Sequence, residues 1–141
     1  MSEVISIKGL ELRFLHSKAD TQGSLDMFEM IVQPHARMPV AHYHESWDET
    51  VYGLEGKMTF RIGDGEVGLS VGETLFIPRG TVHAFRNDGQ VPATCLVVLT
   101  PGVLGIDYFR EVAALLASDT PDLAQMGAIM RRYGLIPAPL N

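Results

Sequence analysis

Short alternating segments dominate the first hundred residues of the chain. Residues 3–7 and 10–15 alternate between apolar and polar positions, and residues 24–32 form a longer segment that ends before Pro34. Successive side chains of a strand point to opposite faces, so this period of two predicts β-strands with one buried face. Glycine, proline and Asp-Gly turns then recur over residues 53–89. Short strands with such regular turns are typical of a sandwich or barrel.

One further segment, Thr94–Thr100, is apolar without polar alternation, which predicts a strand covered on both faces. It contains Cys95, the single cysteine of the chain. No histidine or other base lies near Cys95 in the sequence, so we expect a small buried residue rather than a nucleophile. One cysteine cannot form an internal disulfide, and a reducing cytoplasm is the simplest expectation for localisation.

After Pro101-Gly102 the apolar period changes from two to that of a helix. Two apolar faces are expected, one formed by Phe109, Val112, Ala113 and Leu116 and the other by Leu123, Met126, Met130 and Tyr133. These faces are interpreted as packing surfaces. Thr120 is predicted to cap the second helix, with Pro121 at its first position and Gly134 at its end. We therefore expect a β-domain over residues 1–102 and a two-helix extension over residues 103–141, packed on the same domain.

Length and charge exclude several classes of protein. The chain has 141 residues, of which 46% are hydrophobic and 20% are charged, as in an ordinary single domain. Its net charge of -6 argues against nucleic acid and anionic membrane partners, which require clustered Lys and Arg. No apolar run approaches the roughly 20 residues of a membrane span. The N-terminal residues lack the basic start and apolar core of a secretory signal.

Three of the five histidines lie in two short segments that also contain a glutamate. His42 and His44 are separated by one residue, so on a strand they project from the same face. Glu49 follows after an interval long enough to turn into the next strand, and His83 comes from another hairpin. Imidazole nitrogens with one carboxylate suit a divalent first-row metal and leave positions open for a substrate. His16 and His35 lie outside this set and are interpreted as surface or loop residues.

These segments resemble the two motifs of the cupin superfamily, in particular its small single-domain members that are similar to quercetin dioxygenases. The first motif is represented by His42, His44, Glu49 and Gly56, and the second by Gly72, Pro78, Gly80, His83 and Asn87. Together they span residues 40–87, about a third of the chain. The resemblance implies an all-β double-stranded β-helix, or jelly-roll barrel, with the metal inside its mouth. It supports one divalent transition metal per chain, and the ligand types accept Fe, Mn, Ni, Zn, Co and Cu alike.

Strand parity predicts a largely apolar wall around the metal. If the histidines and Glu49 point inward, then Val40, Val51 and Phe85 share their faces. Met58 and Phe60 are expected to point inward as well, with Arg61 on the outer face. Trp47 lies in the turn before Glu49, at the expected rim. Two interpretations of Trp47 remain open there, a half-exposed loop residue and a gate for the substrate.

An apolar wall favours a small, largely apolar or aromatic substrate over a phosphosugar, whose anion would require an inward Arg or Lys. The first hypothesis is a small dioxygenase-like oxygenase in which Glu49 is both a metal ligand and a candidate proton acceptor. The second is a lyase or isomerase that uses the ion only as a Lewis acid. The third is a module that binds or senses a small molecule without catalysis. A homodimer is also expected, because barrels that resemble this one pair through sheet edges and residues 4–15 offer an apolar strand.

Overall fold

A computed structural model describes residues 3–38 and 40–138 of the chain. The strands are β1 (Glu3–Ile7), β2 (Leu10–His16), β3 (Asp26–Val32), β4 (His42–His44), β5 (Asp48–Glu55), β6 (Met58–Ile62), β7 (Gly65–Leu69), β8 (Thr74–Ile77), β9 (His83–Arg86), β10 (Ala93–Thr100) and β11 (Leu135–Pro137). The helices are α1 (Ile106–Leu116) and α2 (Leu123–Tyr133). The period of two in the sequence therefore marks real strands along the first hundred residues.

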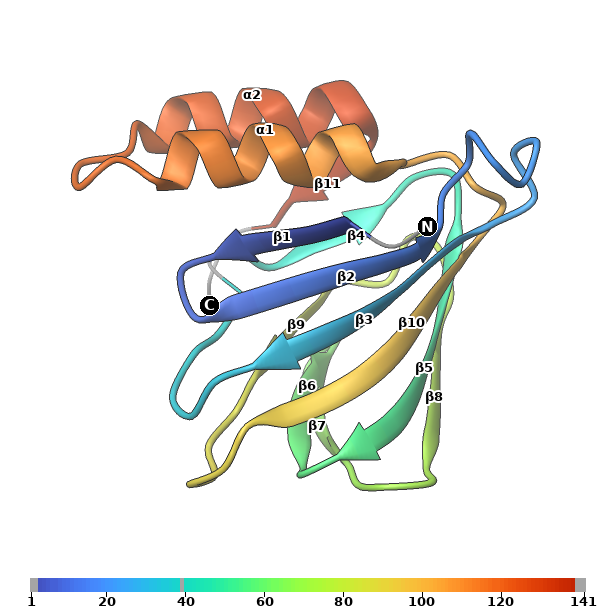
Figure 1. The fold of residues 1–141 in the computed structure, drawn as a ribbon, viewed down its shortest axis with the longest axis vertical. Helices are drawn as coiled ribbons and strands as arrows, with labels where there is room; N and C mark the ends of the chain where they lie inside the picture. The colour runs from blue at the N-terminus through green and yellow to red at the C-terminus, as the bar shows by residue number, and fades with distance from the viewer. Residues whose placement is uncertain (1–2, 39, 139–141) are drawn as a thin grey trace.

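The strands form two antiparallel sheets that enclose the core (Figure 1). The first sheet has the order β1-β2-β3-β10-β5-β8, and the second has the order β11-β4-β9-β6-β7. Inward side chains of both sheets, such as Phe28 and Val97 from the first and Phe60 from the second, belong to one buried cluster. The prediction of an all-β jelly roll with two C-terminal helices is confirmed.

Buried and half-buried residues alternate along β3 and β10, so one face of each of these strands meets the core. In β3, Phe28, Met30 and Val32 are buried, whereas the residues between them are half-buried. The same alternation holds in β10, where Cys95 is buried and Leu96 and Val98 are only half-buried. The prediction that β10 is covered on both faces is therefore wrong, because only its inward face meets the core.

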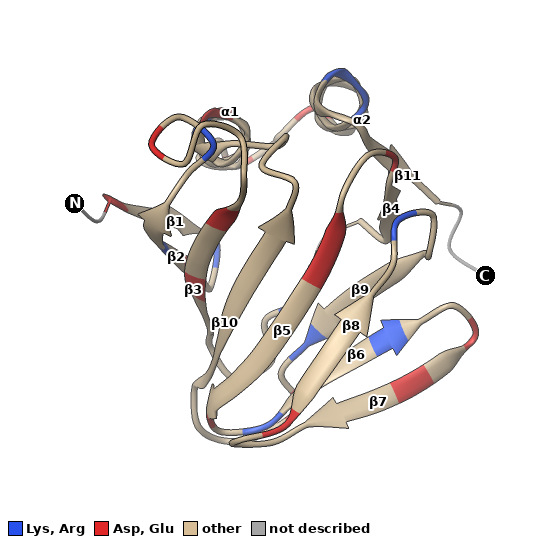
Figure 2. Ribbon diagram, turned by 90° about the vertical axis from the view of Figure 1, so that its right-hand side faces the viewer, with Lys and Arg blue, Asp and Glu red and all other residues tan. Residues whose placement is uncertain are grey.

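The two helices lie across one end of the barrel (Figures 1 and 2). The helical period identified most of the buried positions, although Leu123 at the start of α2 is 70% exposed. The N-cap of α2 is Asp122, whose carboxylate accepts a hydrogen bond from the backbone N–H of Ala124 at 2.9 Å. Thr120 is therefore not the cap, and its prediction was wrong by two residues. Gly134 ends the helix at φ +90°, as predicted.

A short strand that the sequence did not predict follows α2. This strand, β11, pairs antiparallel with β4, so that Leu135 lies opposite His44 and Pro137 opposite His42. The segment after the helices therefore completes the sheet that carries the candidate ligands. Among the described residues, neither helix is long and apolar enough to cross a membrane.

Candidate metal centre

The second sheet brings the three predicted histidine ligands together. His42 and His44 lie on β4, and His83 begins the neighbouring strand β9, where it pairs in register with His42. All three are buried, with exposed fractions of 2%, 4% and 3% respectively. The one-residue spacing on β4 and the antiparallel pairing with β9 thus direct three imidazoles to one point inside the barrel.

Backbone carbonyl groups orient two of the imidazole rings. His42 Nδ1 lies 3.0 Å from the carbonyl oxygen of Val40, and His83 Nδ1 lies 2.9 Å from that of Thr81. A ring that donates its Nδ1–H in this way presents the lone pair of Nε2, which is how metal-binding histidines are commonly held.

The free ring nitrogens have a spacing that suits a metal ion. His42 Nε2 and His44 Nε2 are 3.3 Å apart, and one nitrogen of each of the three rings lies within 4.8 Å of the others. Two nitrogens bound at right angles to one first-row ion at about 2.1 Å would be about 3 Å apart. Only small ring movements therefore separate this geometry from a coordinating one.

Glu49 approaches the imidazoles from the opposite sheet. It lies on β5, and its Oε1 atom is 3.9 Å from His44 Nε2 and 3.7 Å from His83 Nε2. The three imidazole nitrogens form the compact group, and the carboxylate stands on one side of it. The structure thus brings all four predicted ligands to one place, with each sheet contributing.

Burial controls the protonation of these groups. It lowers the pKa of His42 to about 4 and that of His44 to about 2, and the charge of His83 lowers both further. Both rings are therefore neutral at pH 7, as a metal ligand must be. Burial also raises the pKa of the Glu49 carboxyl, because a charge inside the barrel loses its hydration. A divalent cation among these groups would supply the positive charge that a buried carboxylate requires, so the donor set fits a metal.

Trp47 packs behind the imidazoles and not at a rim. Its side chain is completely buried, and its ring stacks on His44 with centroids 4.7 Å apart and an angle of 21° between the planes. Within the described part of the chain, its Nε1 atom makes no hydrogen bond. The structure therefore supports neither interpretation of Trp47, as a half-exposed loop residue or as a gate for the substrate. A Cβ atom at Gly134, which ends α2, would lie only 3.2 Å from Cζ3 of the indole, so the end of the helix packs closely against Trp47.

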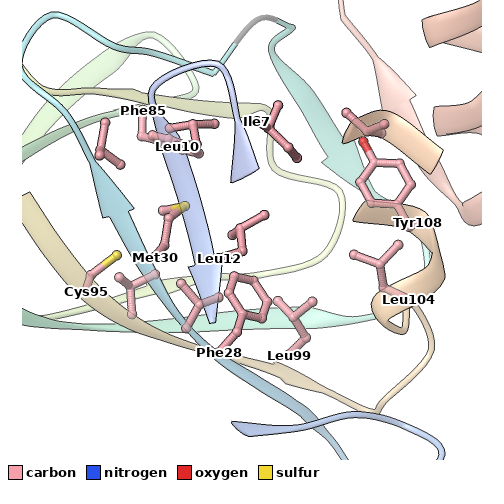
Figure 3. Close-up of a cluster of buried hydrophobic side chains, with 14 of the residues drawn as sticks. Ile7, Leu10, Leu12, Phe28, Met30, Phe85, Cys95, Leu99, Leu104 and Tyr108 are labelled. Carbon is pink, nitrogen blue, oxygen red and sulfur yellow. The ribbon is translucent and has the colours of Figure 1, made fainter. Parts of the chain in front are cut away.

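A small cavity of about 70 Å³ lies beside the three histidines and Glu49. Apart from these four residues its wall is almost entirely apolar, and Figure 3 shows much of this wall converging from the strands of the first sheet and from the segment that begins α1. The wall residues are Ile7, Leu10, Leu12, Phe28, Met30, Met38, Phe85, Val97, Leu99, Leu104, Tyr108, Phe109, Val112, Met126 and Leu135. Among the wall residues, Tyr108 carries a phenol whose pKa is raised by burial, so this side chain is neutral at pH 7.

Most of the predicted pocket residues lie elsewhere in the barrel. Phe85 lines the cavity, but Val51, Met58 and Phe60 are core residues that do not. Val51 is two residues beyond Glu49 on β5, and Phe60 on β6 lies opposite Phe85 on β9. Strand parity gives the face on which a side chain lies but not its depth along the barrel. Val51, Met58 and Phe60 therefore belong to the core of the barrel and not to the wall of the cavity.

Two further residues that the sequence singled out, Val40 as a pocket residue and Asn87 as a motif residue, do not line the cavity. Val40 is half-buried and meets the site through its carbonyl group, which orients His42, rather than as part of the cavity wall. Asn87, the last residue of the second motif, is buried and donates to the carbonyl groups of Val32 and Val91. These hydrogen bonds from Asn87 hold a turn. Arg61 points away from the core, as predicted, and its guanidinium donates a hydrogen bond to the carbonyl group of Gly63.

Sequence reasoning missed the part of the wall that comes from the helices and the first two strands. Tyr108, Val112 and Met126 reach the cavity from α1 and α2. The helical stripe in the sequence identified an apolar face, but such a stripe does not indicate what the face packs against. The alternation in β1 and β2 was the available signal for Ile7 and Leu12, which point inward.

Comparison with known proteins places this site in a family. A family model described as a cupin domain, Cupin_2, matches residues 28–99, about half of the chain. The chain is 42% identical over 73 residues to quercetin 2,3-dioxygenase of Bacillus subtilis (strain 168), which covers 52% of this chain and 21% of that protein. The chain thus spans only about a fifth of the length of this curated relative.

Two solved structures extend the likeness over more of the chain. The polyketide cyclase RemF of Streptomyces resistomycificus is 28% identical with a TM-score of 0.60, covering 71% of this chain and 72% of that chain. A sugar phosphate isomerase of Silicibacter pomeroyi is 26% identical with a TM-score of 0.59, covering 71% of this chain and 70% of that chain. The same barrel therefore occurs in proteins named for different reactions.

Proposed function

This chain belongs to the Cupin_2 family, and from that premise we propose that it is a metal-dependent enzyme acting on a small, largely apolar or aromatic molecule. The observation that carries the proposal is the group of three buried histidines and Glu49 at the wall of an otherwise apolar cavity. Such a combination of a few convergent polar groups with apolar walls is typical of small-molecule sites.

Four residues would hold the ion, namely His42, His44, Glu49 and His83. A bound divalent ion would supply Lewis-acid or redox chemistry at its exchangeable positions. Glu49 is the only carboxylate among the described wall residues, which makes it the candidate proton acceptor for a substrate bound beside it. The neutral hydroxyl of Tyr108 offers a hydrogen bond to a polar atom of that substrate.

The helices belong to the site as well as to the fold. Tyr108 lines the cavity from α1 and Met126 from α2, and Leu104 lines it from the segment before α1. We therefore propose that residues 103–141 belong to the same domain as residues 1–102 and not to an independent unit. The cavity of about 70 Å³ is well below the roughly 300–1,000 Å³ of drug-sized sites, so a larger substrate would enter only if this wall moved.

Oxygenation of the substrate is the first candidate reaction. It is supported by the 42% identity over 73 residues to quercetin 2,3-dioxygenase. The family model that matches residues 28–99 contains all four candidate ligands. A redox-neutral cyclisation or isomerisation is the second candidate, and the likeness to the polyketide cyclase favours it. A phosphosugar substrate is disfavoured because no Lys or Arg is among the described residues that line the cavity. Binding without catalysis is the third candidate.

Elemental analysis of the freshly purified protein tests the metal site. We expect about one divalent ion per chain in the natural protein, and less than about a tenth of that in the double variant His42→Ala/His83→Ala. His16→Ala is the matched control, because His16 is exposed and lies outside the cluster. Stoichiometric metal in the double variant would contradict the assignment of the ligands.

Activity measurements then separate the candidate reactions. Oxygen uptake by Fe-, Mn-, Ni- or Cu-loaded protein, with quercetin as the first aromatic probe, would support the oxygenase. Turnover of an aromatic polyketide probe by Zn-loaded protein under nitrogen would support the redox-neutral reaction instead. A small molecule that co-purifies and remains chemically unchanged after incubation with metal and oxygen would support the binding module and contradict catalysis.

A further inference from the structure

The outer surface of the second sheet carries a recess of about 250 Å³. Three arginines line it, namely Arg37, Arg61 and Arg86. The other described residues that line it are uncharged, and they are Met38, Ala41, Ala84 and Phe85. A chain with a net charge of -6 and only 11 basic residues therefore gathers three of its arginines around one hollow.

Strand pairing brings the three arginines together. Strands β9 and β6 are neighbours in the second sheet (Figure 2). Arg61 on β6 lies opposite Ala84 on β9, and Arg86 is two residues further along β9 on the same outward face. Arg37 forms an isolated antiparallel bridge with Arg86. Residues directly opposite in this way have Cβ atoms about 5 Å apart, so two like charges repel each other unless negative charge lies between them.

The acidic residues of the chain pair with only one of these arginines. Arg86 Nη1 lies 2.6 Å from Oε2 of Glu66, and Arg86 Nε lies 2.9 Å from Oδ2 of Asp88. Among the described residues, neither Arg37 nor Arg61 forms an ion pair. Arg61 donates its Nε–H to the carbonyl group of Gly63, which leaves its terminal nitrogens as donors for a ligand.

Most arginines outside the recess do have an acidic partner. Ion pairs are formed by Arg13, Arg79, Arg110 and Arg132. Within the described part of the chain, Arg131 is the single arginine outside the recess that lacks one. The chain has 17 acidic residues for this purpose, so two unpaired arginines in the same hollow are not the result of a shortage of carboxylates.

We propose that this recess binds a small organic dianion, a dicarboxylate or a phosphate ester, whose negative oxygen atoms bridge Arg37 and Arg61. A guanidinium group presents paired N–H donors that match the oxygens of carboxylate and phosphate. Two guanidinium groups without an acidic partner match two negative charges, and Met38 and Phe85 offer apolar surface to the carbon atoms of the ligand. The volume of about 250 Å³ is just below that of drug-sized sites, so the ligand is expected to be small.

The recess is separate from the candidate metal centre but shares a wall with its cavity. Met38 and Phe85 line both hollows, whereas none of the described residues that line the recess is a candidate metal ligand. Ala84 lines the recess and directly follows His83 on β9, and successive side chains of a strand point to opposite faces. The anion would therefore bind on the reverse side of a strand that carries a candidate ligand.

Titration of the full chain with succinate and with glycerol 3-phosphate, followed by NMR, tests this proposal. At least one probe should bind saturably with a dissociation constant of about a millimolar or less. The amide signals of Ala41 and Ala84 should shift, and the tighter probe identifies the class of anion. Arg37→Ala and Arg61→Ala should each raise the dissociation constant by about tenfold or more, because each removes a charge-assisted contact.

The controls separate this site from a general charge effect and from the metal. Arg131→Ala removes the same charge from α2 and should leave the affinity unchanged. Arg37 is exposed and Arg61 half-buried, so their variants should keep the circular dichroism spectrum and the metal content of the natural protein. Protein from which a chelator has removed any metal should bind the probes as tightly as the metal-loaded protein.

Three results would overturn the proposal. They are no saturable binding of either probe up to about 10 mM, equal affinities of the natural protein and the Arg37→Ala/Arg61→Ala variant, and binding that requires a bound metal. A protein that contains no metal but binds the anion would contradict the proposed function and leave the anion site intact, so the two failures are distinguishable.

Discussion

At the scale of single residues, His44 is held differently from the other two imidazoles. His42 and His83 each donate to a carbonyl group two residues earlier in the chain. Within the described residues, His44 makes no such bond to the backbone, and its ring stacks on the buried indole of Trp47. Its orientation therefore depends on packing, because the face of one ring fixes the plane of the other.

This dependence predicts different results for two substitutions of Trp47. Trp47→Ala should lower the free energy of unfolding by about 3–5 kcal/mol, because it leaves a cavity beside the cluster. Trp47→Phe keeps an aromatic face against His44 and removes no hydrogen bond made within the described residues, so its loss should be smaller. Chemical denaturation measures the stability, and competition with a chelator measures the metal affinity.

The metal affinity should follow the stacking and not the stability alone. We expect Trp47→Phe to bind metal within about threefold of the natural protein, and Trp47→Ala to lose about tenfold or more, as when other supports of a ligand are removed. Equal affinities in folded samples of both variants would show that the stacked ring does not orient His44.

The sequence predicted the four candidate ligands better than it predicted their supports. The period of two placed His42 and His44 on one face without further information. Trp47 was misplaced because it lies in a turn, where no period indicates which way a side chain points. The packing of an indole against a ring three residues away depends on α2 and β11, which approach from the other end of the chain.

At the scale of elements, the last strand supports the strand that carries two ligands. β4 has only three residues, and its single pair with β9 is that of His42 with His83. All three residues of β4 pair with β11. Hydrogen bonds from Glu45 N–H to the carbonyl of Gly134 and from Ala138 N–H to the carbonyl of Ala41 extend this contact at both ends. A strand so short depends on its neighbours for its position.

Truncation after Gly134 is therefore expected to weaken metal binding. It removes β11 and with it the buried Leu135, which lines the cavity. We expect the affinity for metal to fall by about 10- to 100-fold, the range for losing groups that orient metal ligands. Truncation after Ala138 keeps the whole strand and is the control, with affinity unchanged. Isothermal titration with Co²⁺ or Zn²⁺ provides the measurement, and equal affinities for the two truncated proteins would contradict this role of β11.

Elements with a clear period were predictable, and those without one were not. The alternation in β1, β2 and β3 and the stripes of α1 and α2 identified these elements from the sequence alone. β11 has three residues, one of them a proline, which is too short for any period to appear. The sequence likewise did not indicate at which level of the barrel the cavity lies, because this depends on where the helices cross the barrel.

At the scale of the whole molecule, the barrel buries ionisable groups whose charged forms would be stabilised by water in the unfolded chain. In the metal-free protein, the pKa of His42 is about 4 and that of His44 about 2, both below the value of about 6.5 in an unfolded chain. As pH falls below about 6.5, the unfolded state takes up protons that the folded state does not. Each of the two groups therefore lowers the stability by about 1.4 kcal/mol per pH unit until its folded pKa is reached.

Glu49 has the opposite effect over part of this range. Burial raises its pKa in the folded protein, so between the unfolded value of about 4.5 and the raised value the folded state holds a proton that the unfolded state lacks. Lowering the pH through that range therefore increases the contribution of Glu49 to the stability of the folded protein. Two histidines against one glutamate leave a net loss of stability in the metal-free protein as pH falls from about 6 to 4.5.

Metal should raise the melting temperature at neutral pH and lose this effect on acidification. At pH 7.5 the imidazoles of His42 and His44 are neutral and bind without first releasing a proton, so the metal-bound protein should melt well above the metal-free protein. Glu49 must release a proton before it can bind the metal. The difference in melting temperature between the two forms should therefore narrow gradually as pH falls. Because burial lowers the pKa of His42 to about 4, the steep loss should occur near that pH and not near 6.5, where exposed histidines would release a metal. Melting curves of both forms between pH 7.5 and 4 check this sequence of events. A difference that is absent at pH 7.5 with metal bound, or that has vanished by pH 6, would mean that His42 and His44 are not metal ligands.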